Sequence, residues 1–225
     1  MQRIVARELM DDPVESLAEL EGNLSDIEFA NAMFGGSAPV LRAVRASDAR
    51  TVLDVGCGSA DIPLALVRDA ERRGKVLDVT VVDHSEQMLE IARRRTHAHP
   101  RLHFVAAAGE SLPFDAESFD IVTCNLALHH FEPDAARALL AEMRRVARIA
   151  PVVCDLRRSR IGYAATFAWS RLFTRNRLSR HDGPLSVRRA YTPQEALDIA
   201  AGAGWRVPVV RREPFFRMLL TDASR

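Results

Sequence analysis

The stretch that decides the fold is residues 51–60, which read TVLDVGCGSA. A short β-type run, residues 51–55, leads into Gly56-Cys57-Gly58, and the apolar spacing over residues 60–72 is helical. Glycines between a strand and a helix let the backbone approach a ligand closely. A single turn of this kind leaves open which ligand it holds.

The same rhythm continues along the chain. Residues 77–82, 102–105, 119–126 and 151–156 are further β-type runs, and Ser85 and Pro133 mark the starts of helices between them. Alternating strands and helices predict a parallel, doubly wound sheet with helices on both faces. Ligands are then expected at the carboxyl ends of the strands.

Beyond residue 156 the rhythm changes. Residues 161–173 are mostly apolar and aromatic, and residues 175–189 are polar and contain His181-Asp182-Gly183-Pro184, which predicts a turn. Thr192 and Glu195 predict a helix start with a capping box. The β-type runs 205–211 and 215–220, separated by Glu213-Pro214, predict an antiparallel hairpin.

The first fifth of the chain is predicted to be helical. Asp12-Pro13 predicts a helix start, apolar spacing continues to Phe34, and Gly35-Gly36 ends the pattern before Ser37, which is expected to cap a second short helix. Residues 1–48 are interpreted either as helices packed on the edge of the core or as a lid over a small-molecule site. Asn31 and Phe34 would face the pocket of that lid.

Composition limits the function classes. The chain has 225 residues, 48% hydrophobic and 27% charged, so residues 1–225 are expected to form one globular domain. The formal charge of +1 disfavours nucleic acid as a partner. No apolar run approaches the ~20 residues of a membrane span, so no stable membrane insertion is expected. Three cysteines without a CxxC pair, after a start that is too charged for a signal peptide, favour a cytoplasmic location.

Acidic residues around the glycine turn indicate its ligand. Asp54 precedes Gly56 by two residues, and Asp61 stands where a dinucleotide-binding loop has a third glycine. These carboxylates would repel a pyrophosphate by on the order of a few kcal/mol. They suit S-adenosylmethionine (SAM), which carries an ammonium and a sulfonium and no phosphate. Asp83 ends the next strand, where an acid can accept both ribose hydroxyls.

These motifs, in this order, resemble those of the class I SAM-dependent methyltransferases. The resemblance covers about residues 50–155 and rests on VLDVGCG (52–58), VVDHSEQML (81–89), ESLPF (110–114), SFDIV (118–122), LHHFEP (128–133) and MRRV (143–146). It implies a Rossmann-like sheet of seven strands in the order 3-2-1-4-5-7-6 with the last strand antiparallel. It further implies N-terminal helices, a helical lid insertion after strand five (residues 157–192), SAM as the cofactor and S-adenosylhomocysteine as the product.

The resemblance assigns further residues to the cofactor and shows one departure. Ala108 stands where the family usually has an aspartate that accepts from the adenine amino group, and Glu110 is the candidate to replace it. His84 is expected to stack on the adenine, and Asn125 ends strand four at the same edge. No metal is expected, because His97, His99 and His103 have no partner at ligand spacing.

Candidates for the methyl acceptor site follow strands four and five. His129, His130 and His181 are possible general bases, although the first two can equally be packing residues and the third a turn residue. Asp155 and Arg157 are expected to contact substrate. Tyr163 and Trp169 would line an apolar pocket if residues 161–173 form a lid; a membrane-surface helix or a plain core helix are the alternatives.

The sequence therefore predicts a small-molecule methyltransferase, acting as a monomer or homodimer on the oxygen of an aromatic, phenolic or polyketide-type secondary metabolite. One alternative is carbon or nitrogen methylation of a quinone-like or amine substrate. A second alternative is a SAM-binding module without catalysis.

Overall fold

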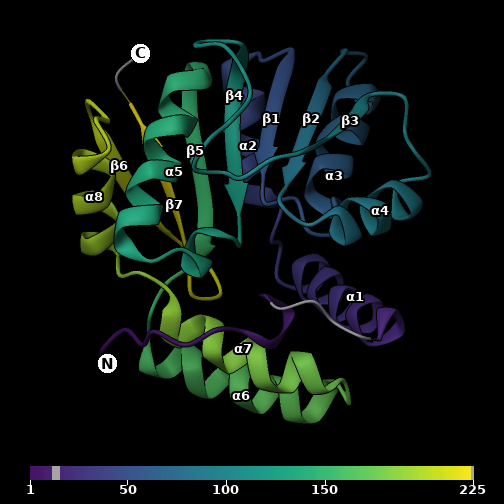
Figure 1. The fold of residues 1–225 in the computed structure, drawn as a ribbon, viewed down its shortest axis with the longest axis vertical. Helices are drawn as coiled ribbons and strands as arrows, with labels where there is room; N and C mark the ends of the chain where they lie inside the picture. Colours follow the sequence, from purple (N-terminus) through teal and green to yellow (C-terminus); the bar gives the residue numbers. More distant parts are fainter. Residues whose placement is uncertain (12–15, 224–225) are drawn as a thin grey trace.

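A seven-stranded sheet organises the protein in the computed structural model, which describes residues 1–11 and 16–223 (Figure 1). Its strand order is β3-β2-β1-β4-β5-β7-β6, as the family resemblance implies. The strands are β1 (Thr51–Val55), β2 (Asp78–Asp83), β3 (Leu102–Ala106), β4 (Phe119–Asn125), β5 (Ala147–Leu156), β6 (Pro208–Glu213) and β7 (Arg217–Asp222). The first five are parallel, and β7 is antiparallel to both β5 and β6.

Helices cover both faces of the sheet, which is why the central strands are mostly apolar on both faces. On one face lie α2 (Ala38–Ser47), α3 (Asp61–Arg72) and α4 (Glu86–Arg95), whose buried side chains include Val40, Leu66 and Leu89. On the other lie α5 (Pro133–Val146) and α8 (Pro193–Gly202), which contribute Leu139, Leu140 and Ile199. Two apolar cores therefore hold the strands in place.

Helix starts follow the capping signals in most places. The Ser85 hydroxyl accepts from the Met88 N–H, and Thr192 and Glu195 form the predicted capping box. The Asp12-Pro13 start lies outside the described residues; within them, Ser16 caps α1 (Leu17–Met33). Ser37 precedes α2 as expected but makes no side-chain cap, since its backbone is already helical at φ −80° and ψ −18°.

The predicted turn at residues 181–184 is wrong. Helix α7 (Arg177–Arg189) runs through it, with Pro184 inside the helix. Proline removes one backbone hydrogen bond there, but tertiary contacts outweigh that loss. The Asp182 carboxylate accepts from the backbone N–H groups of Leu9 and Met10, and Gly183 packs against Thr166 of α6 (Arg160–Phe173).

Several strand boundaries also differ from the prediction, and one of them is that β6 spans Pro208–Glu213 rather than residues 205–211. Strand β5 begins at Ala147, directly after α5, rather than at Pro151. Phe215 and Phe216 have positive φ angles of 55° and 60° and form the hairpin turn, so β7 begins only at Arg217.

A third layer lies across the carboxyl ends of the parallel strands. Figure 1 shows α1, α6 and α7 below the arrowheads of the strands, with the N-terminal segment running along α7 to the short 3-10 helix Leu9–Asp11. Leu20 and Leu24 of α1 pack with Ile91 of α4 and Leu178 of α7. Helices α1, α6 and α7, from the two segments predicted to form a lid, therefore lie over the edge where ligands are expected, whereas α2, which also belongs to residues 1–48, packs on a face of the sheet. None of the helices among the described residues is both long and apolar enough to cross a membrane.

Candidate active site

The glycine turn after β1 combines one tight position with one open position. Gly56 and Gly58 have φ angles of 75° and 51°, a region that favours glycine. A Cβ on Gly56 would lie 2.8 Å from the Cβ of Ala127, in the loop after β4, whereas a Cβ on Gly58 would meet nothing within 4 Å. Gly56 therefore allows two strand ends to meet, and Gly58 leaves space for a ligand.

Asp54 lies buried at the end of β1. Its Oδ1 accepts from the Asn125 amide at 2.6 Å and from the Thr123 hydroxyl, both on the neighbouring strand β4. Burial raises the pKa of this carboxyl to about 7, although both hydrogen bonds act to lower it. Among the described residues, the buried Asn125 Oδ1 has no hydrogen-bond partner. This amide oxygen and the Asp54 carboxyl together suit a cationic ligand group. Thr123, an interior strand residue, carried no signal in the sequence.

Asp83 ends β2, next to the end of β1. Its carboxylate accepts from the Ser85 N–H at 3.0 Å, and burial raises its pKa. The His84 ring is exposed and its Nδ1 lies 3.5 Å from Asp83 Oδ1. Ala108 and Glu110 are both exposed in the loop after β3. The adenine contact predicted for Glu110 in place of Ala108 and the predicted stacking of His84 remain predictions.

The histidine pair after β4 is held by carboxylates. The Asp155 carboxylate accepts from the His129 backbone N–H at 2.8 Å, and its other oxygen lies 2.7 Å from His129 Nδ1. His130 Nδ1 lies 2.6 Å from Asp11 Oδ1. Asp155, predicted to contact substrate, thus orients His129.

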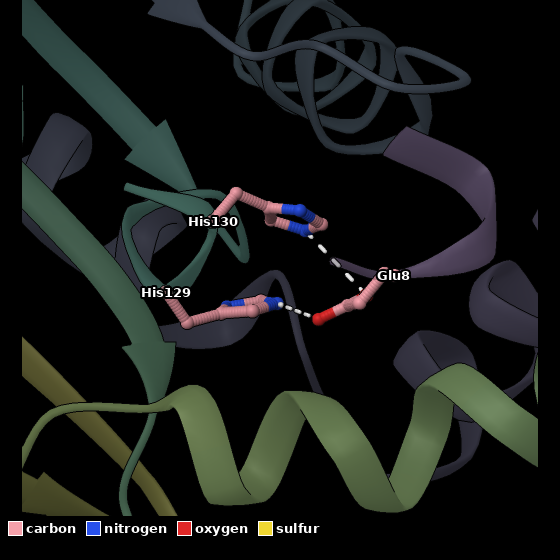
Figure 2. Close-up of side chains that lie close together, drawn as sticks. All are labelled: Glu8, His129 and His130. Carbon is pink, nitrogen blue, oxygen red and sulfur yellow. Dashed lines mark ion pairs between the residues drawn. The ribbon is translucent and has the colours of Figure 1, made fainter. Parts of the chain in front are cut away.

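Glu8 faces both rings from the N-terminal segment (Figure 2). Its carboxylate oxygens lie 3.7 Å from His129 Nε2 and 3.8 Å from His130 Nε2. Burial raises the pKa of Glu8 to about 7. No sequence pattern singles out Glu8, because it lies outside every periodic segment.

His181 lies apart from this pair on α7. Its Nδ1 is 2.7 Å from Asp182 Oδ1 and its side chain is about half exposed. Its ring contacts the neighbouring Asp182, and the structure shows no contact between His181 and His129 or His130 among the described residues.

Aromatic side chains from distant segments meet beside the end of β7. The Phe34 ring centroid lies 6.5 Å from that of Trp169 and 4.9 Å from that of Phe215. Tyr163 stacks on Phe167 of the same helix at 6.3 Å. A cavity of about 230 Å³ is lined by Phe34, Phe215 and Arg217, among others. The structure thus brings together Phe34 and Trp169, which were both predicted to line a pocket. Phe215 belongs to the same cluster and was not predicted.

Polar groups accompany this aromatic cluster. Asn31 donates to Asp61 Oδ2 at 3.0 Å and accepts from Arg217 Nη2 at 3.0 Å, so it connects α1 to the first residue of α3. The Arg157 guanidinium lies 5.9 Å from the centroid of the Phe216 ring. In the part of the chain that the structure describes, four buried donors have no partner: Arg157 Nε, Arg158 Nε, Trp169 Nε1 and Arg217 Nη1.

A larger cavity, of about 460 Å³, lies elsewhere. It is lined by Ser59 and Asp61 at the glycine turn and by Arg68 and Arg95 on α3 and α4. Its lining includes neither Asp54 nor Asp83. We therefore locate the candidate site by its chemistry at the strand ends rather than by this cavity.

The strand order and the acids at the ends of β1 and β2 agree with a family comparison. The model of a family described as a methyltransferase domain matches residues 52–149. Residues 52–149 therefore resemble a methyltransferase domain in sequence, and the sheet has the strand order of the class I SAM-dependent methyltransferase fold. The match runs from β1 into β5, so α1, α6 and α7 lie outside the matched part of this methyltransferase domain.

Curated relatives match the same region. A ubiquinone/menaquinone biosynthesis C-methyltransferase of Rickettsia bellii is 33% identical over 106 residues, which are 46% of this chain and 42% of that protein. A demethylmenaquinone methyltransferase of Staphylococcus epidermidis is 38% identical over 107 residues, 48% of this chain and 42% of that protein. The match thus spans less than half the length of these relatives.

Solved structures share the fold over most of the chain. A Nostoc punctiforme protein described as a candidate O-methyltransferase superposes with a TM-score of 0.67 at 16% identity, over 98% of this chain and 64% of that one. PigF with S-adenosylhomocysteine superposes with a TM-score of 0.63 at 16% identity, over 95% and 63%. These similarities extend the methyltransferase fold to the helices outside the family match.

Proposed function

We propose that this protein binds SAM at the edge formed by Asp54, Gly58 and Asp83 and transfers the methyl group to a small aromatic acceptor. The observation that carries the proposal is the pair of buried carboxyls on adjacent parallel strands. Buried carboxyls need polar partners. The ribose hydroxyls would supply partners to Asp83, and the ammonium of SAM would lie near Asp54 and the unpartnered Asn125 Oδ1.

Oxygen is the acceptor atom that the aromatic cluster favours. Phe34, Trp169 and Phe215 offer apolar faces to a planar molecule. The unpartnered donors Trp169 Nε1 and Arg157 Nε would bind its oxygen atoms. Glu8, His129 or His130 would then accept the proton of the bound hydroxyl and act as the general base. Attack by that oxygen on the methyl carbon breaks the carbon–sulfur bond, so the products are the methyl ether and S-adenosylhomocysteine.

Helices α1, α6 and α7 would act as a lid in this scheme. They lie across the carboxyl edge and leave Asp54, Asp83 and His129 buried (Figure 1). Since methyl transfer depends mainly on the alignment of the acceptor with the methyl group, a closed wall would hold the two in line.

Carbon methylation of a quinone-like ring is the second candidate. The names of the relatives from Rickettsia bellii and Staphylococcus epidermidis favour it. A quinol-type acceptor would fit the same aromatic wall, and the chemistry would differ only in the atom that attacks.

The product distinguishes these candidates. Purified protein is incubated with isotope-labelled SAM and a panel of phenols, aromatic acids and quinols, and the products are identified by mass spectrometry and NMR. We expect a labelled methyl group on oxygen, and loss of product in Asp83→Ala. A methyl group on a ring carbon would replace the oxygen proposal by the second candidate. SAM binding with no labelled product from any acceptor would favour a binding module without catalysis.

A further inference from the structure

Glu8, His129 and the partly exposed His130 bring potential metal-ligand atoms together after the end of β4. Asp155 is a hydrogen-bond acceptor, so a neutral His129 donates to it from Nδ1 and has a lone pair on Nε2. Asp11 holds Nδ1 of His130 in the same way. Both Nε2 atoms face Glu8, and Figure 2 shows the two rings on one side of that carboxylate.

The spacing of these atoms is too long for hydrogen bonds and close to that of metal ligands. The distances from the two Nε2 atoms to Glu8 are 3.7 Å and 3.8 Å, and the candidate ligand atoms all lie within 4.8 Å of one another. Bonds of about 2.0–2.2 Å to a zinc ion hold neighbouring ligands about 3.4 Å apart in a tetrahedral site. Small side-chain movements therefore suffice to bring the three onto one ion.

The surroundings resemble the supporting contacts of known metal sites. Histidine ligands commonly donate their other ring nitrogen to a carboxylate, which fixes the ring and its tautomer. Here Asp155 and Asp11 make that contact to His129 and His130. The Ser186 hydroxyl donates to Glu8 Oε1 at 3.0 Å and fixes the carboxylate.

Charge in the cluster leaves room for a cation. Among the described residues in ion-pair contact with the cluster, the carboxylates are Glu8, Asp11 and Asp155, and the guanidinium is Arg189. Arg189 lies 2.7 Å from Asp11 and also donates to the backbone carbonyl of His130, so it is already engaged. If both histidines are neutral, three carboxylates and one guanidinium leave a net charge of about −2. Two protons or one divalent cation would neutralise it.

We propose that Glu8, His129 and His130 bind one divalent first-row metal ion, with zinc as the best match to two imidazoles and a carboxylate. The set of two histidines and one glutamate is that of several catalytic zinc sites, which keep a fourth position open. His130 is the partly exposed member of the three, so the open position faces its side of the cluster. An acceptor oxygen bound there would ionise more readily beside the ion. Metal binding itself does not depend on the proposed function.

The test uses the full chain without an affinity tag of histidines. Metal is removed with a chelator, and Zn²⁺ and then Co²⁺ are titrated while heat, visible absorption and thermal unfolding are recorded. We expect about one equivalent of either ion, a higher unfolding temperature with metal, and Co²⁺ absorption bands typical of nitrogen and oxygen ligands. SAM is left out, so failure of the proposed methyl transfer would not affect the result.

Variants separate this site from adventitious binding. Glu8→Gln keeps the size of the side chain and its acceptor for Ser186, and His130→Asn removes an imidazole at a partly exposed position; each should weaken Zn²⁺ binding by about 100-fold or more. Asp155→Asn should weaken it by about 10- to 100-fold. His103→Ala, an exposed histidine on β3, is the matched control and should bind as the parent protein does.

Two results would overturn the proposal. One is no uptake of Zn²⁺ or Co²⁺ by the folded parent protein. The other is uptake that Glu8→Gln and His130→Asn leave unchanged, both being folded by circular dichroism. In either case protons on the imidazoles and Glu8 would balance the charge of the cluster instead, and NMR of ring nitrogens would show Nε2 protonated with and without Zn²⁺.

Discussion

Asp155 holds His129 at both its backbone and its ring, with contacts of 2.8 Å to the backbone nitrogen and 2.7 Å to Nδ1. Asp155 lies near the end of β5 and His129 follows β4, so the ends of two adjacent parallel strands are joined through this carboxylate. The contact fixes the tautomer of the ring and turns its Nε2 toward Glu8. Asp155 is in this arrangement a positioning residue.

Replacing Asp155 by asparagine should therefore impair the histidine more than the fold. An amide can still accept from the backbone N–H of His129, but its NH₂ group favours the wrong tautomer of the ring. We expect turnover to fall by about 10²-fold or more, with little change in the affinity for SAM. Steady-state kinetics on Asp155→Asn, beside Glu132→Gln as a half-exposed control, measures this. Equal turnover in both variants would show that the orientation of His129 is irrelevant to the reaction.

The two glycines of the turn should respond differently to alanine. Gly56→Ala forces a Cβ against Ala127 at a positive φ, and we expect it to lower the free energy of unfolding by about 1–2 kcal/mol or more. Gly58→Ala causes the same backbone strain without the contact to Ala127. This variant should therefore lose less stability, and its main effect should be weaker SAM binding. Urea unfolding and SAM titration of both variants provide the comparison. Identical losses of stability would contradict the structural difference between the two positions.

Stability should depend on pH through Asp54. Burial raises the pKa of Asp54 from 3.8 to about 7, so the folded protein holds this proton more tightly than the unfolded chain does. Its contribution to the free energy of unfolding therefore falls as the pH rises from about 4 to about 7. Without cofactor, Asp54→Asn should be more stable than the parent at pH 8 by up to a few kcal/mol, and the difference should vanish near pH 4.

Asp120 provides a control, because its pKa is shifted in the opposite direction and its effect on stability should therefore change with pH in the opposite sense. Its pKa is lowered by hydrogen bonds from the backbone of Arg50 and Thr51 and by Arg148, although burial acts to raise it. Asp120→Asn should thus be less stable than the parent at pH 8, and that deficit should shrink in acid. If both variants changed in the same direction with pH, burial would not be the cause of the behaviour of Asp54.

Substitutions in the aromatic cluster of Phe34, Trp169 and Phe215 should weaken binding of the acceptor rather than binding of SAM. Trp169→Ala removes both the ring that contacts Phe34 and the buried donor Nε1. We therefore expect the KM for the acceptor to rise by at least about 10-fold. SAM affinity should stay as in the parent. Leu172→Ala, exposed on the same helix, is the matched control. A change in SAM affinity with an unchanged acceptor KM would place Trp169 at the cofactor instead.

The sheet could be predicted from the sequence because the central parallel strands are mostly apolar runs with a polar residue at or near the carboxyl end. Thr51–Val55 and the acids Asp54 and Asp83 lie where that pattern places them. Helix α7 could not be predicted, because Gly183-Pro184 favours a turn locally and only the contacts of Asp182 and Thr166 with other segments reverse that preference.

The candidate site was predicted in part for the same reason. His129 and Asn125 follow a strand end, so topology brings them to the ligand edge. Glu8 and Arg217 reach that region through tertiary contacts, from an irregular N-terminal segment and from the antiparallel strand β7. No local pattern marks such residues, since their neighbours in space are distant in sequence.

The central claim is that SAM binds at the edge formed by Asp54 and Asp83, and isothermal titration calorimetry of SAM and S-adenosylhomocysteine tests it most directly. We expect one equivalent of either ligand and binding weaker by about 1–3 kcal/mol in Asp83→Ala, which leaves the ribose hydroxyls without their charged acceptor. Asp78→Ala, at the opposite end of β2, should bind as the parent protein does. Folded protein that binds neither ligand, or Asp83→Ala with unchanged affinity, would contradict the account.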